Sequence, residues 1–192
     1  MDLSTLATTF GVIFLAELGD KTQLTAMALA LRFPWRRILV GISCAFALLN
    51  LLAVLIGSIL FAVIPLFWVK VISGILFIIF GFGAFRAGMD DGEPPSSRQA
   101  ATAFRTAFLM IFFAEMGDKT QIITASLAAQ TPRMFQVFAG STLALVGVAL
   151  IGIFLGRRIL ERIPLPIVHR AAGVLFLTFG GVILWQALTS AG

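Results

Sequence analysis

Charged residues are scarce in this sequence, and their scarcity excludes a water-soluble globule. Only 12% of the 192 residues are charged, 59% are hydrophobic, and the mean hydropathy is +1.03. A soluble domain needs more polar surface than this, because about a quarter of its residues are normally charged. We therefore expect an integral membrane protein whose surroundings are the lipid bilayer.

Cysteine and histidine are almost missing as well. Cys44 is the single cysteine and His169 the single histidine. One cysteine excludes an internal disulfide, and the lack of clustered cysteines and histidines argues against a zinc or copper site. No lysine or arginine precedes Lys21. The first apolar segment thus lacks the basic start of a cleavable signal peptide, and we expect it to be retained as a span.

Long apolar runs are what the sequence has in place of charge. A helix of about 20 apolar residues crosses the roughly 30 Å of hydrocarbon in a bilayer. The runs that reach this length are residues 3–31, 37–64, 66–87, 101–130, 134–156 and 167–189. We predict an all-α integral membrane protein with six transmembrane helices.

The basic residues are unevenly distributed between the two sides of these predicted helices. The loops after the first, third and fifth helices contain Arg32, Arg36, Arg37, Arg86, Arg98, Arg105, Arg157, Arg158, Arg162 and Arg170. The opposite side has only Lys70 and Arg133. The positive-inside rule places the arginine-rich loops in the cytoplasm and both termini outside it. The net charge of +5 therefore reflects orientation, and we expect no nucleic-acid partner.

One heptapeptide occurs twice, once in each half of the chain. Glu-Leu-Gly-Asp-Lys-Thr-Gln at residues 17–23 returns as Glu-Met-Gly-Asp-Lys-Thr-Gln at 115–121. Later segments also correspond, as 74–77 does to 173–176. Each half holds an odd number of predicted helices, so the second half enters the membrane from the opposite face, as in many transporters. We predict two inverted three-helix repeats, 1–88 and 100–192, joined by a cytoplasmic linker, 89–99.

Both heptapeptides place charges inside predicted membrane spans. Three charges in one span cost roughly 8–10 kcal/mol on the insertion scale, whereas each central Leu or Phe contributes only about 0.3–0.6 kcal/mol. Ion pairs that merely lock the first and fourth helices together are the structural alternative. On an unbroken helix Glu17, Asp20 and Lys21 share one face. Gly19 would instead allow the helix to open there, and the sequence leaves both arrangements open.

The charged groups of the two motifs sum to a value that suits a divalent cation. Glu17, Asp20, Glu115 and Asp118 together with Lys21 and Lys119 carry a net charge of −2. Oxygen ligands of this kind suit hard ions such as Mn²⁺, Ca²⁺ and Mg²⁺. Exchange of the metal against protons is natural, since carboxylates must lose protons to bind it. The amide of Asn50 is a further candidate for the site, and an interhelical hydrogen bond explains it equally well.

The twin Glu-x-Gly-Asp-Lys-Thr motifs on the first and fourth predicted spans resemble the GDT-type cation/proton exchanger family. The resemblance covers nearly the whole chain, and the family is associated with Mn²⁺ and Ca²⁺ transport in exchange for protons. It implies a cation site at Glu17, Asp20, Glu115 and Asp118, with Lys21, Thr22, Lys119 and Thr120 in supporting positions. Gln23 and Gln121, which end the two motifs, are further supporting candidates.

These observations together predict a secondary transporter that exports Mn²⁺ from the cytoplasm in exchange for protons by alternating access. The resemblance implies a bacterial, manganese-exporter-like member of the family, so we expect the protein in the bacterial inner (plasma) membrane, with both termini periplasmic and no cofactor. A Ca²⁺/proton exchanger is the nearest alternative, followed by an exporter of small organic solutes such as amino acids. An intramembrane enzyme is not expected, because neither Gly-x-Gly-Asp nor His-Glu-x-x-His occurs. The sequence indicates no oligomeric state.

Overall fold

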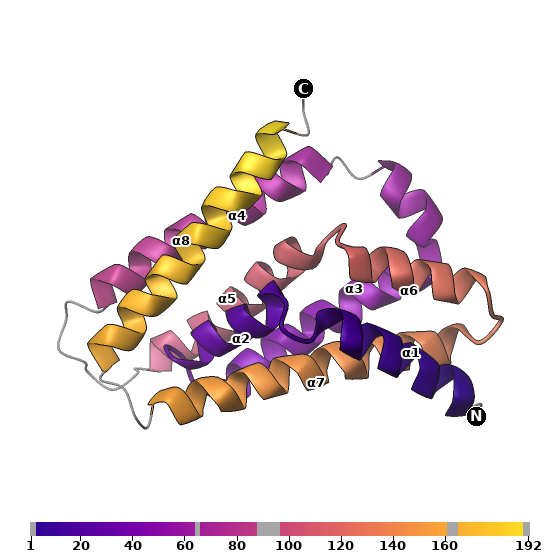
Figure 1. The fold of residues 1–192 in the computed structure, drawn as a ribbon, viewed down its shortest axis with the longest axis horizontal. Helices are drawn as coiled ribbons and strands as arrows, with labels where there is room; N and C mark the ends of the chain where they lie inside the picture. Colours follow the sequence, from indigo (N-terminus) through magenta and orange to yellow (C-terminus); the bar gives the residue numbers. More distant parts are fainter. Residues whose placement is uncertain (1–2, 64–65, 88–96, 161–164, 190–192) are drawn as a thin grey trace.

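The computed structural model describes residues 3–63, 66–87, 97–160 and 165–189. Within these ranges the secondary-structure elements are all α-helices (Figure 1). They are α1 (Leu3–Glu17), α2 (Lys21–Ala30), α3 (Trp35–Val63), α4 (Leu66–Ala87), α5 (Ser97–Glu115), α6 (Lys119–Ala129), α7 (Met134–Leu160) and α8 (Leu165–Thr189). The predicted linker 89–99 lies largely outside the described residues, and its last three residues already belong to α5.

The predicted spans differ in whether they form one helix or two. Long, apolar stretches cover Trp35–Leu55, Phe67–Arg86, Met134–Arg158 and Arg170–Thr189. The predicted spans 3–31 and 101–130 are each divided into two helices. α1 and α2 together are apolar enough to form one span, bent by 75°. α5, which contains Arg98 and Arg105, and α6 are not among the candidate spans of the described residues. The all-α membrane class is confirmed, with four or five candidate spans among the described residues rather than the predicted six.

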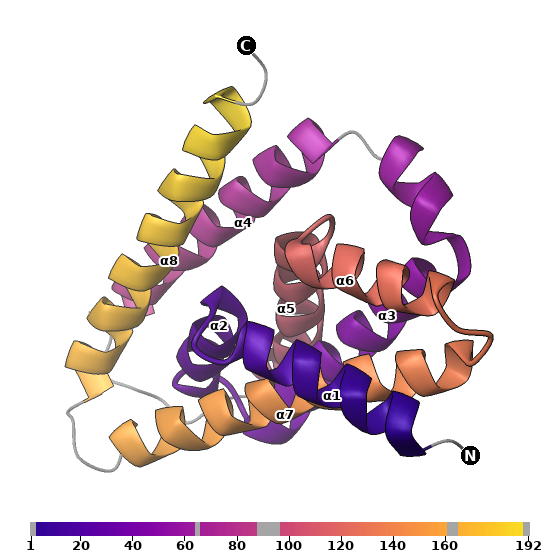
Figure 2. The same ribbon diagram turned by 45° about the vertical axis from the view of Figure 1, so that its right-hand side comes forward.

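Each half of the chain packs its divided helices against the long helix of the other half. α1 and α2 contact α7, while α5 and α6 contact α3 (Figure 2). Two glycines make this packing close. A Cβ atom at Gly41 of α3 would lie 2.6 Å from the carbonyl oxygen of Phe104, and one at Gly140 of α7 would lie 2.8 Å from that of Leu6. These glycines have the packing role common in membrane helices.

α4 and α8 form a pair that lies along one side of the other helices (Figures 1 and 2). The pair contacts the rest of the molecule through α5 and α2. Ser73 of α4 donates a hydrogen bond to the carbonyl oxygen of Phe113 in α5, at 2.6 Å. Arg32, which follows α2, donates to the carbonyl oxygens of Phe80 and Gly83 in α4, at 3.3 and 2.9 Å. Hydrogen bonds to main-chain carbonyls thus hold the pair on this side.

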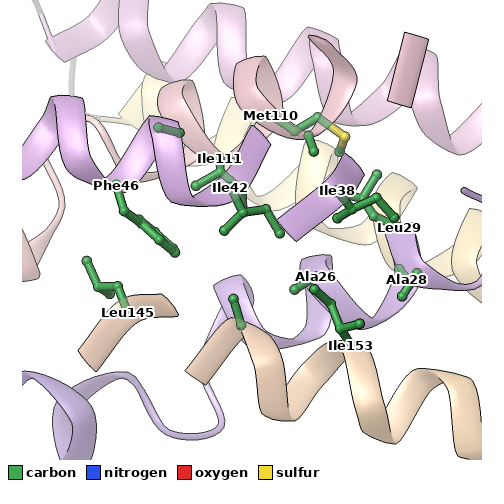
Figure 3. Packing of buried hydrophobic residues seen from close by; sticks show 14 of the residues in the cluster. Ala26, Ala28, Leu29, Ile38, Ile42, Phe46, Met110, Ile111, Leu145 and Ile153 are labelled. Atoms are coloured by element: carbon green, nitrogen blue, oxygen red, sulfur yellow. The ribbon is translucent and has the colours of Figure 1, made fainter. Parts of the chain in front are cut away.

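The apolar core brings together helices from both halves. Phe46 of α3, Ile111 of α5 and Ile153 of α7 are fully buried within it (Figure 3). In contrast, Trp68 on α4 and Trp185 on α8 are 60% and 70% exposed. Large apolar side chains on the outside of a bundle are expected where the surroundings are lipid rather than water.

Candidate cation site

A short break separates the two helices of each divided pair, and a glycine occupies it. Gly19 has a φ of +85° and Gly117 a φ of +79°, a region that residues with a Cβ atom rarely adopt. Asp20 and Asp118 then occupy the N-cap positions of α2 and α6 with extended backbone, and the side chain of Asp20 accepts a hydrogen bond from the main-chain nitrogen of Lys21. The structure therefore decides the question that the sequence left open, because both motif helices are broken at the motif.

The glutamines that end the motifs stabilise these breaks. Gln23 Oε1 accepts a hydrogen bond from the main-chain nitrogen of Gly19, at 2.7 Å. Gln121 Oε1 accepts one from the nitrogen of Gly117, at 2.9 Å. Main-chain groups freed by a helix break need such partners away from water. In the structure, both glutamines therefore stabilise the helix breaks at the two motifs.

The two motifs contact each other through reciprocal side-chain pairs. Lys21 Nζ lies 2.9 Å from Asp118 Oδ2, and Lys119 Nζ lies 2.6 Å from Asp20 Oδ2. The hydroxyl groups form a second reciprocal set, in which Thr22 donates to Glu115 and Thr120 donates to Glu17. Each contact joins one half of the chain to the other. The two motifs therefore lie in direct contact.

Three of the four predicted carboxylates converge on one point. One oxygen each of Glu17, Glu115 and Asp118 can be chosen so that all lie within 4.8 Å of one another. Glu17 is fully buried and Glu115 is 3% exposed. Among the described residues, Glu17 Oε2 is buried and has no hydrogen-bond partner. Asp20 is not in this group, and its carboxylate accepts hydrogen bonds from Lys119 Nζ and from the main-chain nitrogen of Lys21.

A pocket of about 100 Å³ lies between α4, α8 and the second motif and reaches Asp118 of this cluster. Its polar lining includes Lys21, Lys70, Ser73, Asp118 and Gln186. Met116, in the break between α5 and α6, also lines it, together with apolar residues of α4, α5 and α8. Ser73, Lys70 and Gln186 are candidate path residues that the sequence did not single out. A hydroxyl or an amide in an apolar helix is a weak signal, because an interhelical hydrogen bond explains it as well.

Asn50 pairs with a side chain outside the two motifs. Its side-chain nitrogen donates to Thr142 Oγ1, at 3.1 Å, and the residue is 1% exposed. This bond links α3 to α7. Of the two interpretations of Asn50, the structure contains the interhelical hydrogen bond.

The donor atoms at the cluster are all oxygens. Carboxylates from Glu17, Glu115 and Asp118 converge with the hydroxyl groups of Thr22 and Thr120 that bond them. Hard divalent cations prefer such ligands, whereas softer ions select sulfur and imidazole. Cys44 is exposed rather than directed into the cluster. The residues present therefore fit a hard divalent cation as substrate.

The chain matches a known family over both halves. The match is to the family described as divalent cation/proton antiporter GDT1, at residues 5–92 and 103–191. This chain belongs to that family. The GDT1 family is one of membrane antiporters, which agrees with the expected absence of enzyme activity and with the helical, apolar fold. The two matched segments each contain one copy of the heptapeptide.

Relatives of similar length carry the same family name or a transport description. A GDT1-like protein of Synechocystis sp. is 33% identical over 197 residues, covering 92% of this chain and 95% of its own. A proposed manganese exporter of Vibrio cholerae is 32% identical over 183 residues, covering 91% and 88%. GDT1-like protein 5 of Arabidopsis thaliana is 31% identical, covering 87% and 89%. No solved structure matches the chain significantly.

Proposed function

We propose that this GDT1-family antiporter exports Mn²⁺ from the cytoplasm in exchange for protons. We assign Glu17, Glu115 and Asp118 as ligands of the transported ion and Asp20 as the fourth carboxylate of the same network. The convergence of these buried oxygens carries the proposal. The likeness to the proposed manganese exporter of Vibrio cholerae supports Mn²⁺ as the ion. The same oxygen ligands also suit Ca²⁺, which makes Ca²⁺/proton exchange the second candidate.

Alternating access has a physical basis in the position of the α4 and α8 pair. α4 packs against α5 and α8 against α2, whereas contacts of α8 with α1 and of α4 with α6 are at most marginal. If the halves are inverted repeats of 1–88 and 100–192, exchanging these contacts generates a second arrangement with access from the other side. Ser73 and Arg32 hold the present arrangement. Their bonds would have to break during each cycle.

The orientation of this arrangement in the membrane follows from the distribution of arginines. We place both termini in the periplasm of a bacterium, with the protein in its inner membrane. The pocket that reaches Lys21 and Asp118 is lined by residues near the start of α4 and the end of α8, such as Lys70 and Gln186. Both ends face the periplasm in this orientation. The pocket would therefore open to the periplasm.

Cysteine labelling tests the orientation and the side of the pocket together. Gln186 is exposed and lines the pocket, so Gln186→Cys in a Cys44→Ser background offers one reactive thiol. We expect a membrane-impermeant maleimide to label it from the periplasmic side. Labelling only after access to the cytoplasmic side would contradict the orientation. The Cys44→Ser parent serves as the control for background labelling.

Transport by the purified protein in liposomes tests the proposed function directly. Vesicles loaded with Mn²⁺, Ca²⁺, Mg²⁺ or Zn²⁺ are diluted into acidic or neutral medium, and ion efflux and internal pH are followed. We expect Mn²⁺ efflux that is accelerated by external acid and accompanied by internal acidification. Faster Ca²⁺ efflux would favour the second candidate, and efflux of neither ion would refute the proposal. Vesicles without protein provide the leak rate.

A further inference from the structure

The lysines of the two motifs are paired across the halves in a way that packing alone does not require. Each lysine contacts the aspartate of the opposite motif rather than that of its own. The threonines beside them already join the halves through hydrogen bonds to Glu115 and Glu17. An ion pair is a costly means of joining helices in an apolar medium. Joining the two halves is therefore not a sufficient reason for the presence of the two lysines.

Lys21 and a bound cation would compete for the same carboxylate. Asp118 contributes an oxygen to the group of three within 4.8 Å, and its Oδ2 is also 2.9 Å from Lys21 Nζ. A divalent ion among these oxygens would stand close to an ammonium group of the same sign. The side chains of Lys21 and Asp118 are each only 25% exposed, and repulsion between partly buried charges is stronger than between charges in bulk water. The lysine must either weaken ion binding or leave Asp118 when the ion arrives.

The lysines also set the total charge of the site in each loaded form. The four carboxylates and two ammonium groups sum to −2, so one divalent ion or two protons bring the site to neutrality. Without the lysines the ion-loaded site would carry a charge of −2. A buried net charge is expensive inside a membrane and would oppose the rearrangement that moves the site from one side to the other.

We propose that Lys21 and Lys119 are tethered counter-cations: Lys21 occupies Asp118 between loads and yields it to the transported ion, while Lys119 stays with Asp20 and balances the charge of the same site. This assignment rests on the proposed function. In it, the lysines lower the affinity for the ion and so allow its release, and they keep the loaded site neutral. They are positioning residues that act through the carboxylates rather than ligands of the ion.

Replacing each lysine with methionine separates this role from a structural one. We expect Lys21→Met and Lys119→Met to bind Mn²⁺ at least tenfold more tightly than the wild type in nanodiscs. We also expect both variants to release Mn²⁺ from liposomes at least tenfold more slowly. Lys21→Arg and Lys119→Arg keep the charge and should bind within about threefold of the wild type. Arg105→Met removes an exposed positive charge elsewhere on α5 and should change neither quantity.

The direction of the affinity change decides the matter. If the lysines only hold the halves together, their removal will loosen the site and weaken Mn²⁺ binding. Unchanged or weaker Mn²⁺ binding in both Met variants would therefore overturn the proposal. Lys21→Met leaves the less exposed aspartate unpaired and is the variant more at risk of misfolding. Lys119, whose side chain is 49% exposed, then provides the same test. A wild type that neither binds nor transports Mn²⁺ or Ca²⁺ would instead refute the proposed function itself.

Discussion

Replacing Glu17 or Glu115 with glutamine is expected to reduce coupled Mn²⁺ transport at least a hundredfold. Both side chains are buried, and each contributes an oxygen to the carboxylate cluster. Glutamine keeps the shape and one oxygen but removes the charge. Two unit charges 4 Å apart attract each other by about 4 kcal/mol at an effective dielectric constant of 20, and a divalent ion is held more strongly still. A tenfold change in affinity corresponds to about 1.4 kcal/mol. The loss of one carboxylate should therefore lower the affinity for Mn²⁺ by much more than tenfold.

The glutamine variants should remain folded and inserted in the membrane. The amide oxygen can still accept a hydrogen bond from the hydroxyl group of Thr120 in Glu17→Gln, or of Thr22 in Glu115→Gln. The contact between the halves is therefore retained. Glu161→Gln, at a position outside the described residues, is the matched control and should transport normally. Efflux is measured in liposomes with equal amounts of monodisperse protein. Normal transport and an unchanged pH dependence in both variants would show that the site is assigned wrongly.

The repeated heptapeptide was sufficient to predict that the two halves meet at one site, but it did not predict which residues pair. On an unbroken helix, Lys21 lies on the same face as Glu17 and Asp20. The break at Gly19 starts a new helix at Lys21 with a different direction, so Lys21 reaches Asp118 instead. Whether a glycine adopts a positive φ depends on the tertiary contacts around it. The reciprocal pairs could therefore be recognised only in the three-dimensional structure.

The pocket was beyond prediction for a related reason. Ser73, Lys70 and Gln186 come from α4 and α8, which share no motif with residues 17–23 or 115–121. Their position beside Asp118 depends on how the α4 and α8 pair packs against α5 and α2. Hydropathy predicts that α4 and α8 are helices in the membrane, and it carries no information on their position around the bundle. The polar path to the site is thus a property of packing.

The apparent affinity for Mn²⁺ is expected to fall steeply as the pH is lowered. Mn²⁺ binds ionised carboxylates, so any proton bound to the cluster must leave before the ion is held. In that pH range each displaced proton lowers the association constant about tenfold per pH unit, and two displaced protons lower it about a hundredfold. Outside the cell, acid would then release the ion, while the more neutral cytoplasm would favour its binding. A proton gradient directed inward can thereby drive export.

Titrations of the purified protein with Mn²⁺ from about pH 5.5 to about pH 8 measure this linkage. The slope of the logarithm of the association constant against pH gives the number of protons displaced. In Glu115→Gln one titratable carboxylate is missing, so the slope should decrease by up to one where Glu115 is among the groups that release a proton. Arg105→Met should keep the wild-type slope, because it removes no carboxylate. An association constant that is the same across the whole range would mean that protons and Mn²⁺ do not share these carboxylates, and exchange would need a separate proton path.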